Sequence, residues 1–192
     1  KTMLEDLVRL GIGDSKIRVR PFADNSSYKF VSRTSSKNKY CTFIYPASSA
    51  PHKNHINLFK AMKVVFEYGI QFKLYVTLDD LSFKRLCIEC DLDSLVNNLF
   101  IENIGDVSHE KIIQYYSFSD ALVFPSFSES FGLPLYEAKV LDLPVIASEL
   151  DFVRDIVCPV QTFDPNSYIS ISRAITRFLC IEEELQEVVT PN

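Results

Sequence analysis

From residue 41 onward, short apolar runs alternate with longer segments in which apolar residues recur every three or four positions. A continuous apolar run is typical of a strand buried on both faces, and the longer spacing is typical of an amphipathic helix. The runs predict strands at 41–45, 72–76, 99–104, 121–124 and 144–147. The periodic segments predict helices at 55–68, 79–90, 108–116, from 133 or 134 onward, and 166–179.

The order of these segments predicts the fold class. Strand and helix alternate about five times, which indicates an α/β, Rossmann-like parallel sheet with helices on both faces. In such sheets ligands bind beyond the carboxyl ends of the strands, near the switch in strand order. The residues that follow each strand are therefore the candidates for a functional site.

The first 39 residues follow a different pattern. Residues 1–10 have apolar positions on one helical face, and residues 24–39 are polar and rich in serine, lysine and asparagine. The polar stretch is typical of a loop or hinge. Because the chain begins at Lys1 rather than at methionine, we also expect it to be a piece of a longer protein.

Composition and charge narrow the possible partners. With 192 residues, 47% of them hydrophobic and 23% charged, the chain has the size and composition of one ordinary globular domain. The net charge of −5 argues against a nucleic-acid partner, which selects basic surfaces. No apolar run reaches the ~20 residues that cross a membrane, and charged residues interrupt the first 30 residues, so we expect neither a membrane span nor a signal peptide.

The cysteines and histidines do not form a metal-ligand pattern. Of five cysteines only Cys87 and Cys90 are close in sequence, and none of the three histidines has a cysteine beside it. A zinc site needs a second such pair or histidines at ligand spacing. We therefore expect no metal, and we interpret these thiols as helix residues in a reducing compartment.

Three of the loops that follow strands carry candidate residues. Lys53 precedes a predicted helix start, where an amine and unpaired backbone N–H groups hold phosphate, although the residues alone favour a solvated lysine in a turn. Residues 77–80 (Thr77 to Asp80) are best interpreted as a helix cap. Gly105 lets a ring or ribose approach the backbone closely, which is weak evidence alone.

The loop after the strand at 121–124 is the richest in functional groups. Glu129 lies in it, Gly132 permits an unusual backbone angle, and Glu137 falls in the first turn of the helix that opens near Pro134. Backbone amides at a helix start between two carboxylates suit a phosphorylated sugar. The alternative is structural, with Glu137 complementing the helix dipole and Glu129 solvated in the loop.

Several motifs together closely resemble a known family. They are GDVS at 105–108, YSFSDALVFPS at 116–126, ESFGLPLYEA at 129–138 and LPVIAS at 143–148. This set resembles the C-terminal, donor-binding domain of family 4 glycosyltransferases, which are retaining enzymes with two Rossmann-like domains (the GT-B fold). YPA at 45–47 and HKN at 52–54 are similar to the branch that builds bacterial surface polysaccharides. The likeness extends over residues 17–179.

The resemblance implies roles for three charged residues. Glu129 matches the glutamate that faces the donor sugar, and Lys53 matches the lysine that binds the diphosphate and stabilises the leaving group. Glu137 matches the glutamate that accepts hydrogen bonds from the ribose. Lys53 and Glu129 are thus the expected catalytic residues, and Glu137 the expected ribose ligand.

The resemblance also implies contacts between the donor and the residues around the strand ends. The nucleobase is expected near Gly105 and Val107, and the sugar and diphosphate near the backbone of Phe131, Gly132 and Leu133. Thr77 could offer its hydroxyl to the nucleotide. The family needs no metal and no cofactor besides the donor. Ser48 occupies a position where an arginine is common, which removes one cation expected near the diphosphate.

The resemblance finally implies an organisation and an activity. Residues 1–39 are expected to be the end of an N-terminal domain and the hinge, and residues 40–192 the nucleotide-sugar-binding domain. The whole protein would transfer a hexose to a saccharide or lipid-linked saccharide acceptor, held by an N-terminal domain that this chain lacks. It would work in the cytoplasm or at the inner membrane face, in O-antigen or capsule synthesis, and the chain alone would be inactive.

Two other classes of function remain open from the sequence. One is another enzyme of the same fold, such as a sugar-nucleotide epimerase or a phosphorylase. The other is a binding module without catalytic activity. The pair of glutamates favours transfer over the other enzymes, and the presence of Lys53, Glu129 and Glu137 together argues against a decayed module.

Overall fold

The computed structural model describes residues 9–11, 40–98 and 100–179. Within them six strands form one parallel sheet in the order β3-β2-β1-β4-β5-β6. The strands are β1 (Cys41–Tyr45), β2 (Phe72–Val76), β3 (Ile101–Asn103), β4 (Ala121–Phe124), β5 (Val145–Ser148) and β6 (Gln161–Phe163). This order is that of a Rossmann fold. It confirms the predicted class.

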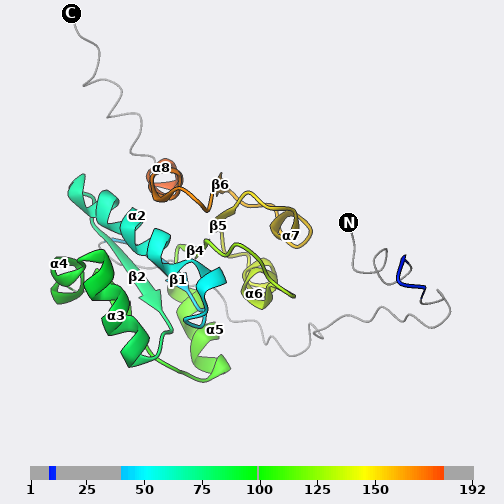
Figure 1. The fold of residues 1–192 in the computed structure, drawn as a ribbon, viewed down its shortest axis with the longest axis horizontal. Coiled ribbons are helices and arrows are strands. Elements are labelled where there is room, and N and C mark those ends of the chain that lie inside the picture. The colour runs from blue at the N-terminus through cyan, green and yellow to red at the C-terminus, as the bar shows by residue number, and fades with distance from the viewer. Residues whose placement is uncertain (1–8, 12–39, 99, 180–192) are drawn as a thin grey trace, which may run out of the picture.

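Helices connect the strands and cover both faces of the sheet (Figure 1). They are η3 (Pro51–Lys53), α2 (His55–Glu67), α3 (Asp80–Cys90), α4 (Asp93–Asn97), α5 (His109–Phe118), α6 (Leu133–Val140), α7 (Asp151–Arg154) and α8 (Tyr168–Phe178). The chain runs outward through β1, β2 and β3 and then, in the other direction, through β4, β5 and β6. Because such crossovers are right-handed, α2 and α3 lie on one face, and α5 and α6 on the other. The last helix, α8, packs beside α2.

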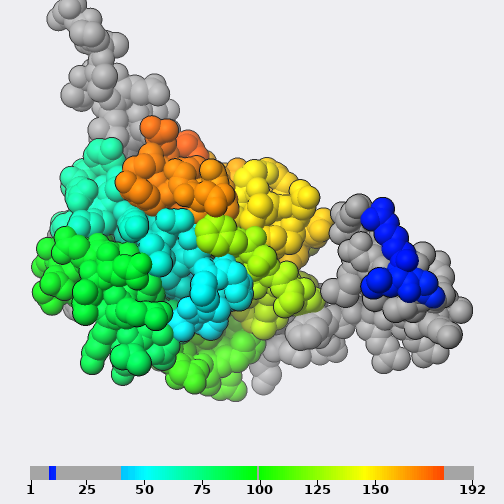
Figure 2. All heavy atoms as spheres, viewed as in Figure 1, coloured from blue at the N-terminus to red at the C-terminus, as the bar shows by residue number. Residues whose placement is uncertain are grey.

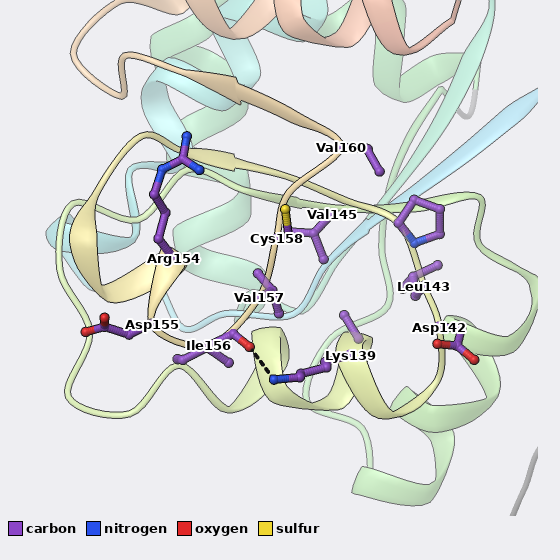
Figure 3. Close-up of a pocket in the computed structure, with 12 residues that line it drawn as sticks. Lys139, Asp142, Leu143, Val145, Arg154, Asp155, Ile156, Val157, Cys158 and Val160 are labelled. Atoms are coloured by element: carbon purple, nitrogen blue, oxygen red, sulfur yellow. Dashed lines mark hydrogen bonds between the residues drawn. The ribbon is translucent and has the colours of Figure 1, made fainter.

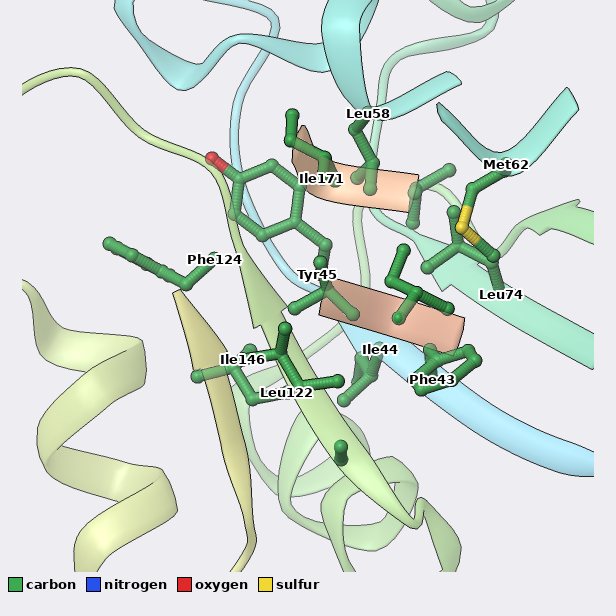
Figure 4. Packing of buried hydrophobic residues seen from close by; sticks show 14 of the residues in the cluster. Phe43, Ile44, Tyr45, Leu58, Met62, Leu74, Leu122, Phe124, Ile146 and Ile171 are labelled. Atoms are coloured by element: carbon green, nitrogen blue, oxygen red, sulfur yellow. The ribbon is translucent and has the colours of Figure 1, made fainter. Parts of the chain in front are cut away.

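The core fills the space between the sheet and these helices. Figure 4 shows Leu58 and Met62 of α2 and Ile171 of α8 lying over the strands. Successive strand residues point to opposite faces, so Ile44 and Tyr45 serve different sides of the sheet, and both are fully buried. Burial on both sides explains why the central strands β1 and β4 are almost entirely apolar.

Four elements were not predicted from the sequence. β6 has three residues, of which Gln161 and Thr162 are polar, and it pairs with β5 alone at the edge of the sheet. The helical segments η3, α4 and α7 have three to five residues each, too few to show a helical period. The sheet therefore has one strand more than expected. The predictions for residues 1–39 lie outside the described residues, apart from 9–11.

Candidate active site

The candidate site lies where the strand order reverses. β1 and β4 are neighbours in the sheet, and the chain leaves them in opposite directions. The loops beyond their carboxyl ends therefore face each other, as in other sheets of this type. In Figure 2 the segment containing η3 and the start of α2, in cyan, lies between α3 in green and the segment around α6 in yellow-green.

The side chains of Lys53 and Glu129 are in contact at the point where the strand order reverses. Lys53 follows β1, Glu129 follows β4, and Nζ of Lys53 lies 2.8 and 2.7 Å from Oε1 and Oε2 of Glu129. Only 18% of the lysine side chain and 8% of the glutamate side chain are exposed. An ion pair withdrawn this far from water is screened less than a surface pair. The two predicted catalytic residues are thus in direct contact.

Tyr45, the last residue of β1, supports Lys53 from the core. Its hydroxyl donates to the backbone oxygen of Lys53 at 2.8 Å and lies 2.8 Å from Oγ of Ser126. A phenol has one proton to donate, so the Ser126 hydroxyl donates to the tyrosine oxygen. Burial raises the pKa of Tyr45, and the nearby Glu129 charge acts in the same direction. The phenol therefore stays protonated and joins the two loops.

Asn54 adds a second link between the loops. Its Nδ2 donates to the backbone oxygens of Pro125, at 3.0 Å, and of Pro165, at 2.8 Å. Its backbone is left-handed, with φ of 61°, a conformation that asparagine tolerates better than most residues. The backbone N–H of Phe127 also donates to the oxygen of His52 at 2.8 Å. The segment that carries Lys53 is therefore tied to the loop after β4.

Gly132 shapes the start of α6. It is the N-cap with φ of 72°, and a Cβ at this position would lie 2.9 Å from Cδ1 of Ile156. Leu133 is the first helical residue and Pro134 the second, a place where proline is favoured. The backbone at 132–133 therefore forms a helix start, as predicted. Phe131, just before it, is 39% exposed beside Tyr136.

Glu137 is held from α5. Its side chain is 3% exposed, its Oε2 accepts from the hydroxyl of Tyr116 at 2.9 Å, and its Oε1 lies 2.6 Å from Nε2 of His109. Because a carboxylate oxygen can only accept, the proton in the second contact is on His109 Nε2. Glu137 therefore does more than complement the helix dipole.

The residues after β2 and β3 form a further part of the sheet edge that carries the candidate site. Asn103 joins them: its Oδ1 accepts from the N–H groups of Leu78, at 2.9 Å, and Gly105, at 3.3 Å. Gly105 has φ of 71°, which explains the glycine, and Val107 is half-buried. Thr77 donates from Oγ1 to the oxygen of Ala47 at 3.4 Å.

The capping interpretation of residues 77–80 is confirmed, and a second side-chain cap occurs at Ser108. Asp79, within the segment 77–80, accepts from the N–H of Ser82 at 2.9 Å at the start of α3. Ser108 accepts from the N–H of Lys111 at the start of α5. Both side chains satisfy backbone N–H groups that have no partner within their helix.

His55, the first residue of α2, is buried behind Lys53. Its ring lies 4.9 Å from that of Tyr45 and 6.0 Å from that of Phe59, measured between centroids. Desolvation, with a smaller contribution from the Lys53 charge, lowers the pKa of His55 from 6.5 to about 4. Its Nε2 is buried without a hydrogen-bond partner among the described residues. His55 is therefore a neutral core residue rather than a candidate acid or base.

Two cavities are lined by residues other than the three charged residues of the candidate site. The larger, about 610 Å³, is lined by Lys139, Val145 and Cys158 among others, at the opposite end of β5 from the site (Figure 3). There Nζ of Lys139 donates to the backbone oxygen of Ile156 at 2.9 Å. The smaller, about 270 Å³, lies beside η3, with Ser49 and Arg85 in its lining. Neither lining contains Lys53, Glu129 or Glu137.

The described cysteines are not arranged for metal chemistry. Over residues 9–11, 40–98 and 100–179, no group of three or more His, Cys, Asp and Glu side chains could hold a metal ion. Burial raises the pKa of Cys41 to about 12 and that of Cys87 to about 11. Both thiols therefore stay protonated and unreactive at neutral pH. In the same part of the chain no helix is long and apolar enough to span a membrane.

Comparison with known proteins identifies the family. Residues 28–191 match the family described as "Glycosyl transferases group 1". The chain belongs to this family. Membership in glycosyl transferases group 1 confirms the resemblance inferred from the motifs at 105–148.

The relatives of this group 1 domain include bacterial enzymes. It is 26% identical over 147 residues to the serotype-specific mannosyltransferase WbdA of Escherichia coli. This match covers 74% of this chain and 18% of WbdA. It is 30% identical over 122 residues to the O-antigen chain mannosyltransferase RfbU of Salmonella typhimurium, covering 63% of this chain and 33% of RfbU. The chain thus spans at most a third of either relative.

Solved structures of glycosyltransferases share the fold. The apo form of the lipopolysaccharide outer core galactosyltransferase WaaB superposes with a TM-score of 0.64 at 19% identity, over 94% of this chain and 51% of WaaB. A glycosyltransferase from Rickettsia africae superposes with a TM-score of 0.64 at 21% identity, over 75% of this chain and 38% of that enzyme. The domain is therefore one half of a GT-B fold.

The functional contacts that the sequence did not predict include those made by Tyr45, Asn54, His109 and Tyr116. In the sequence Tyr116 falls in a predicted helix and in the motif at 116–126, and His109 has no assigned role, although the two are seven positions apart and so share one face of α5. That shared face was the one available signal. The donor contacts expected for the predicted site residues stay predictions.

Proposed function

We propose that this domain binds the nucleotide-diphosphate sugar of a retaining hexosyltransferase that extends a bacterial surface polysaccharide. The observation that carries the proposal is the Lys53–Glu129 ion pair across the reversal of strand order. It places a cation and a carboxylate, both largely shielded from water, where parallel α/β sheets bind ligands. The names of the relatives, O-antigen and serotype-specific mannosyltransferases, support a hexose and a polysaccharide.

The charges support a division of roles. When the donor binds, the amine of Lys53 exchanges Glu129 for the diphosphate, and the freed carboxylate accepts hydrogen bonds from the sugar hydroxyls. The amides at 131–133 meet the sugar and diphosphate at the start of α6, and the ribose hydroxyls donate to Glu137. The nucleobase lies near Gly105 and Val107, within reach of Thr77. Each group is complementary to the part of the donor it is assigned.

The transfer itself breaks the bond between the anomeric carbon and the diphosphate oxygen. The nucleoside diphosphate leaves with the bonding electrons, and the acceptor oxygen forms the new glycosidic bond while its proton passes to the departing diphosphate. Lys53 stabilises the charge that develops on the departing oxygen, so the proposal requires no metal ion and no cofactor. Residues 40–192 are the donor domain in this scheme, and residues 1–39 lead from an N-terminal domain that binds a saccharide or lipid-linked acceptor at the cytoplasmic side.

Titration calorimetry of the full-length protein with UDP- and GDP-sugars tests the proposal. We expect one of these donors to bind, and Glu137→Ala to weaken its binding. Nucleotide should be released from that donor only when acceptor is present. Failure to bind any nucleotide sugar contradicts the proposal, and isomerisation of the donor without acceptor indicates an epimerase instead.

A further inference from the structure

His109 is a half-exposed side chain in contact with a buried carboxylate. It is the first residue of α5, its side chain is 56% exposed, and its Nε2 lies 2.6 Å from Oε1 of Glu137. The Glu137 side chain is only 3% exposed. A buried carboxylate oxygen needs a hydrogen-bond partner in place of water, and His109 provides one from the solvent side.

A second donor completes the arrangement around Glu137. Tyr116, fully buried, donates to Oε2 at 2.9 Å. Tyr116 lies seven residues after His109, about two helical turns, so both side chains leave the same face of α5 toward α6. Each carboxylate oxygen thus has one donor from α5. A carboxylate offers about four lone-pair sites, so two further donors can be accepted.

We propose that His109 is a positioning residue that holds the Glu137 carboxylate in the orientation that receives the ribose hydroxyls of the donor. The inference rests on the proposed function, which assigns the ribose to Glu137. The terminal torsion of a glutamate is broad, so a single donor at Oε2 leaves the carboxylate plane free to turn. A second donor at Oε1 fixes the plane. The ribose then finds both acceptors already oriented, at a smaller entropic cost.

The proposal predicts that the loss of affinity caused by removing His109 depends on the ribose hydroxyls of the ligand. Removing the imidazole should weaken the binding of a nucleotide only if that nucleotide carries the ribose hydroxyls. A merely structural role would weaken the binding of every nucleotide equally, because the whole site would be disturbed. The difference between the two ligands therefore separates positioning from general damage.

The experiment uses calorimetry on the full-length protein with whichever of UDP or GDP the wild type binds, and with the 2′,3′-dideoxy form of that nucleotide. His109→Ala should reduce the affinity for the ribonucleotide about tenfold, the effect of losing one well-placed hydrogen bond to a charged group. It should change the affinity for the dideoxy form less than about twofold. His109→Gln, which keeps an N–H near the position of Nε2, should retain most of the wild-type affinity.

Glu110→Gln is the matched control. Glu110 is the next residue of the same helical turn and is exposed, so this variant should bind both ligands as the wild type does. Equal losses for the two ligands in His109→Ala, or no loss for the ribonucleotide, overturn the inference and leave the proposed function standing. A wild-type protein that binds no nucleotide sugar overturns both.

Discussion

Lys53 and Glu129 are 76 positions apart in the sequence, yet Nζ of Lys53 lies within 2.8 Å of both carboxylate oxygens of Glu129. Strands β1 and β4 bring them together, because neighbouring parallel strands end at the same edge of the sheet. The pair is therefore formed by the fold before any ligand binds.

The coupling between these two residues can be measured. Lys53→Met leaves a carboxylate that is 8% exposed without its cation, so we expect it to lower the free energy of unfolding by roughly 1–3 kcal/mol. Glu129→Gln should also destabilise the protein, and the double variant should lose less free energy of unfolding than the sum of the two single variants. Urea denaturation of all four proteins gives the coupling. In the proposed enzyme Lys53→Met should also slow transfer about 100-fold or more.

The control for this double-mutant comparison is the pair of Lys63 and Asp91. Their atoms are equally close, at 2.7 Å, but 28% and 83% of the side chains are exposed. Water and salt screen such a pair, so its coupling should be clearly smaller. Equal coupling in the two pairs would show that burial does not strengthen the Lys53–Glu129 contact.

Asn54 offers a test of the link between the two loops. Asn54→Gly keeps the left-handed backbone accessible and removes the hydrogen bonds to Pro125 and Pro165, so it should destabilise by about 2 kcal/mol. Asn54→Ala should cost about 1 kcal/mol more, because alanine is strained at φ of 61°. Urea denaturation compares the variants. A glycine variant as stable as the wild type would show that the two hydrogen bonds contribute nothing.

Gly132→Ala should destabilise the protein and weaken donor binding. At φ of 72° an alanine is strained by about 1–2 kcal/mol, and its Cβ would also press on Ile156. Gly69→Ala is the control, since Gly69 has φ of 79° but no atom within 4 Å of a Cβ. Thermal and urea unfolding should show the larger loss at Gly132, and Ile156→Val should recover part of it. Equal losses at both glycines would mean that Ile156 moves aside freely.

The low pKa of the buried His55 predicts how the stability of the protein depends on pH. Its pKa is about 4 in the folded chain and 6.5 when exposed, so between these values the unfolded chain binds a proton that the folded chain does not. The free energy of unfolding should therefore fall as the pH is lowered from about 6.5 to about 4, with a contribution from His55 on the order of 1–3 kcal/mol.

His55→Phe tests this contribution because phenylalanine does not titrate. Its free energy of unfolding should fall less steeply than that of the wild type over the same range. His52→Phe replaces an exposed histidine one turn earlier and serves as the control for introducing a phenylalanine into this segment. Identical slopes for His55→Phe and the wild type would contradict the assignment.

The sequence predicted the fold well where burial leaves a plain pattern. The strands at 41–45, 72–76 and 121–124 have the predicted bounds, since most of their residues are apolar and buried. β6 was missed because an edge strand of three residues needs neither an apolar run nor a period. The prediction thus failed where tertiary pairing rather than local pattern determines structure.

The candidate site was predicted in part for a similar reason. Lys53 and Glu129 follow predicted strands, so topology alone brings them to one edge. The contacts of Glu137 with His109 and of Asn54 with Pro165 depend on side-chain direction across elements far apart in the sequence. A single sequence does not encode such pairs in any local pattern.

Tyr45 gives the fold a further property. Its ring is fully buried in the core, while its hydroxyl holds the backbone of Lys53 and contacts Ser126. The same side chain thus belongs to the hydrophobic interior and to the loops of the candidate site. The N–H of Lys53, which donates to the oxygen of Ala50, the N-cap of η3, should therefore exchange with deuterium as slowly as the amides of β1. The loop around Lys53 would then lose its structure only together with the sheet, as one cooperative unit.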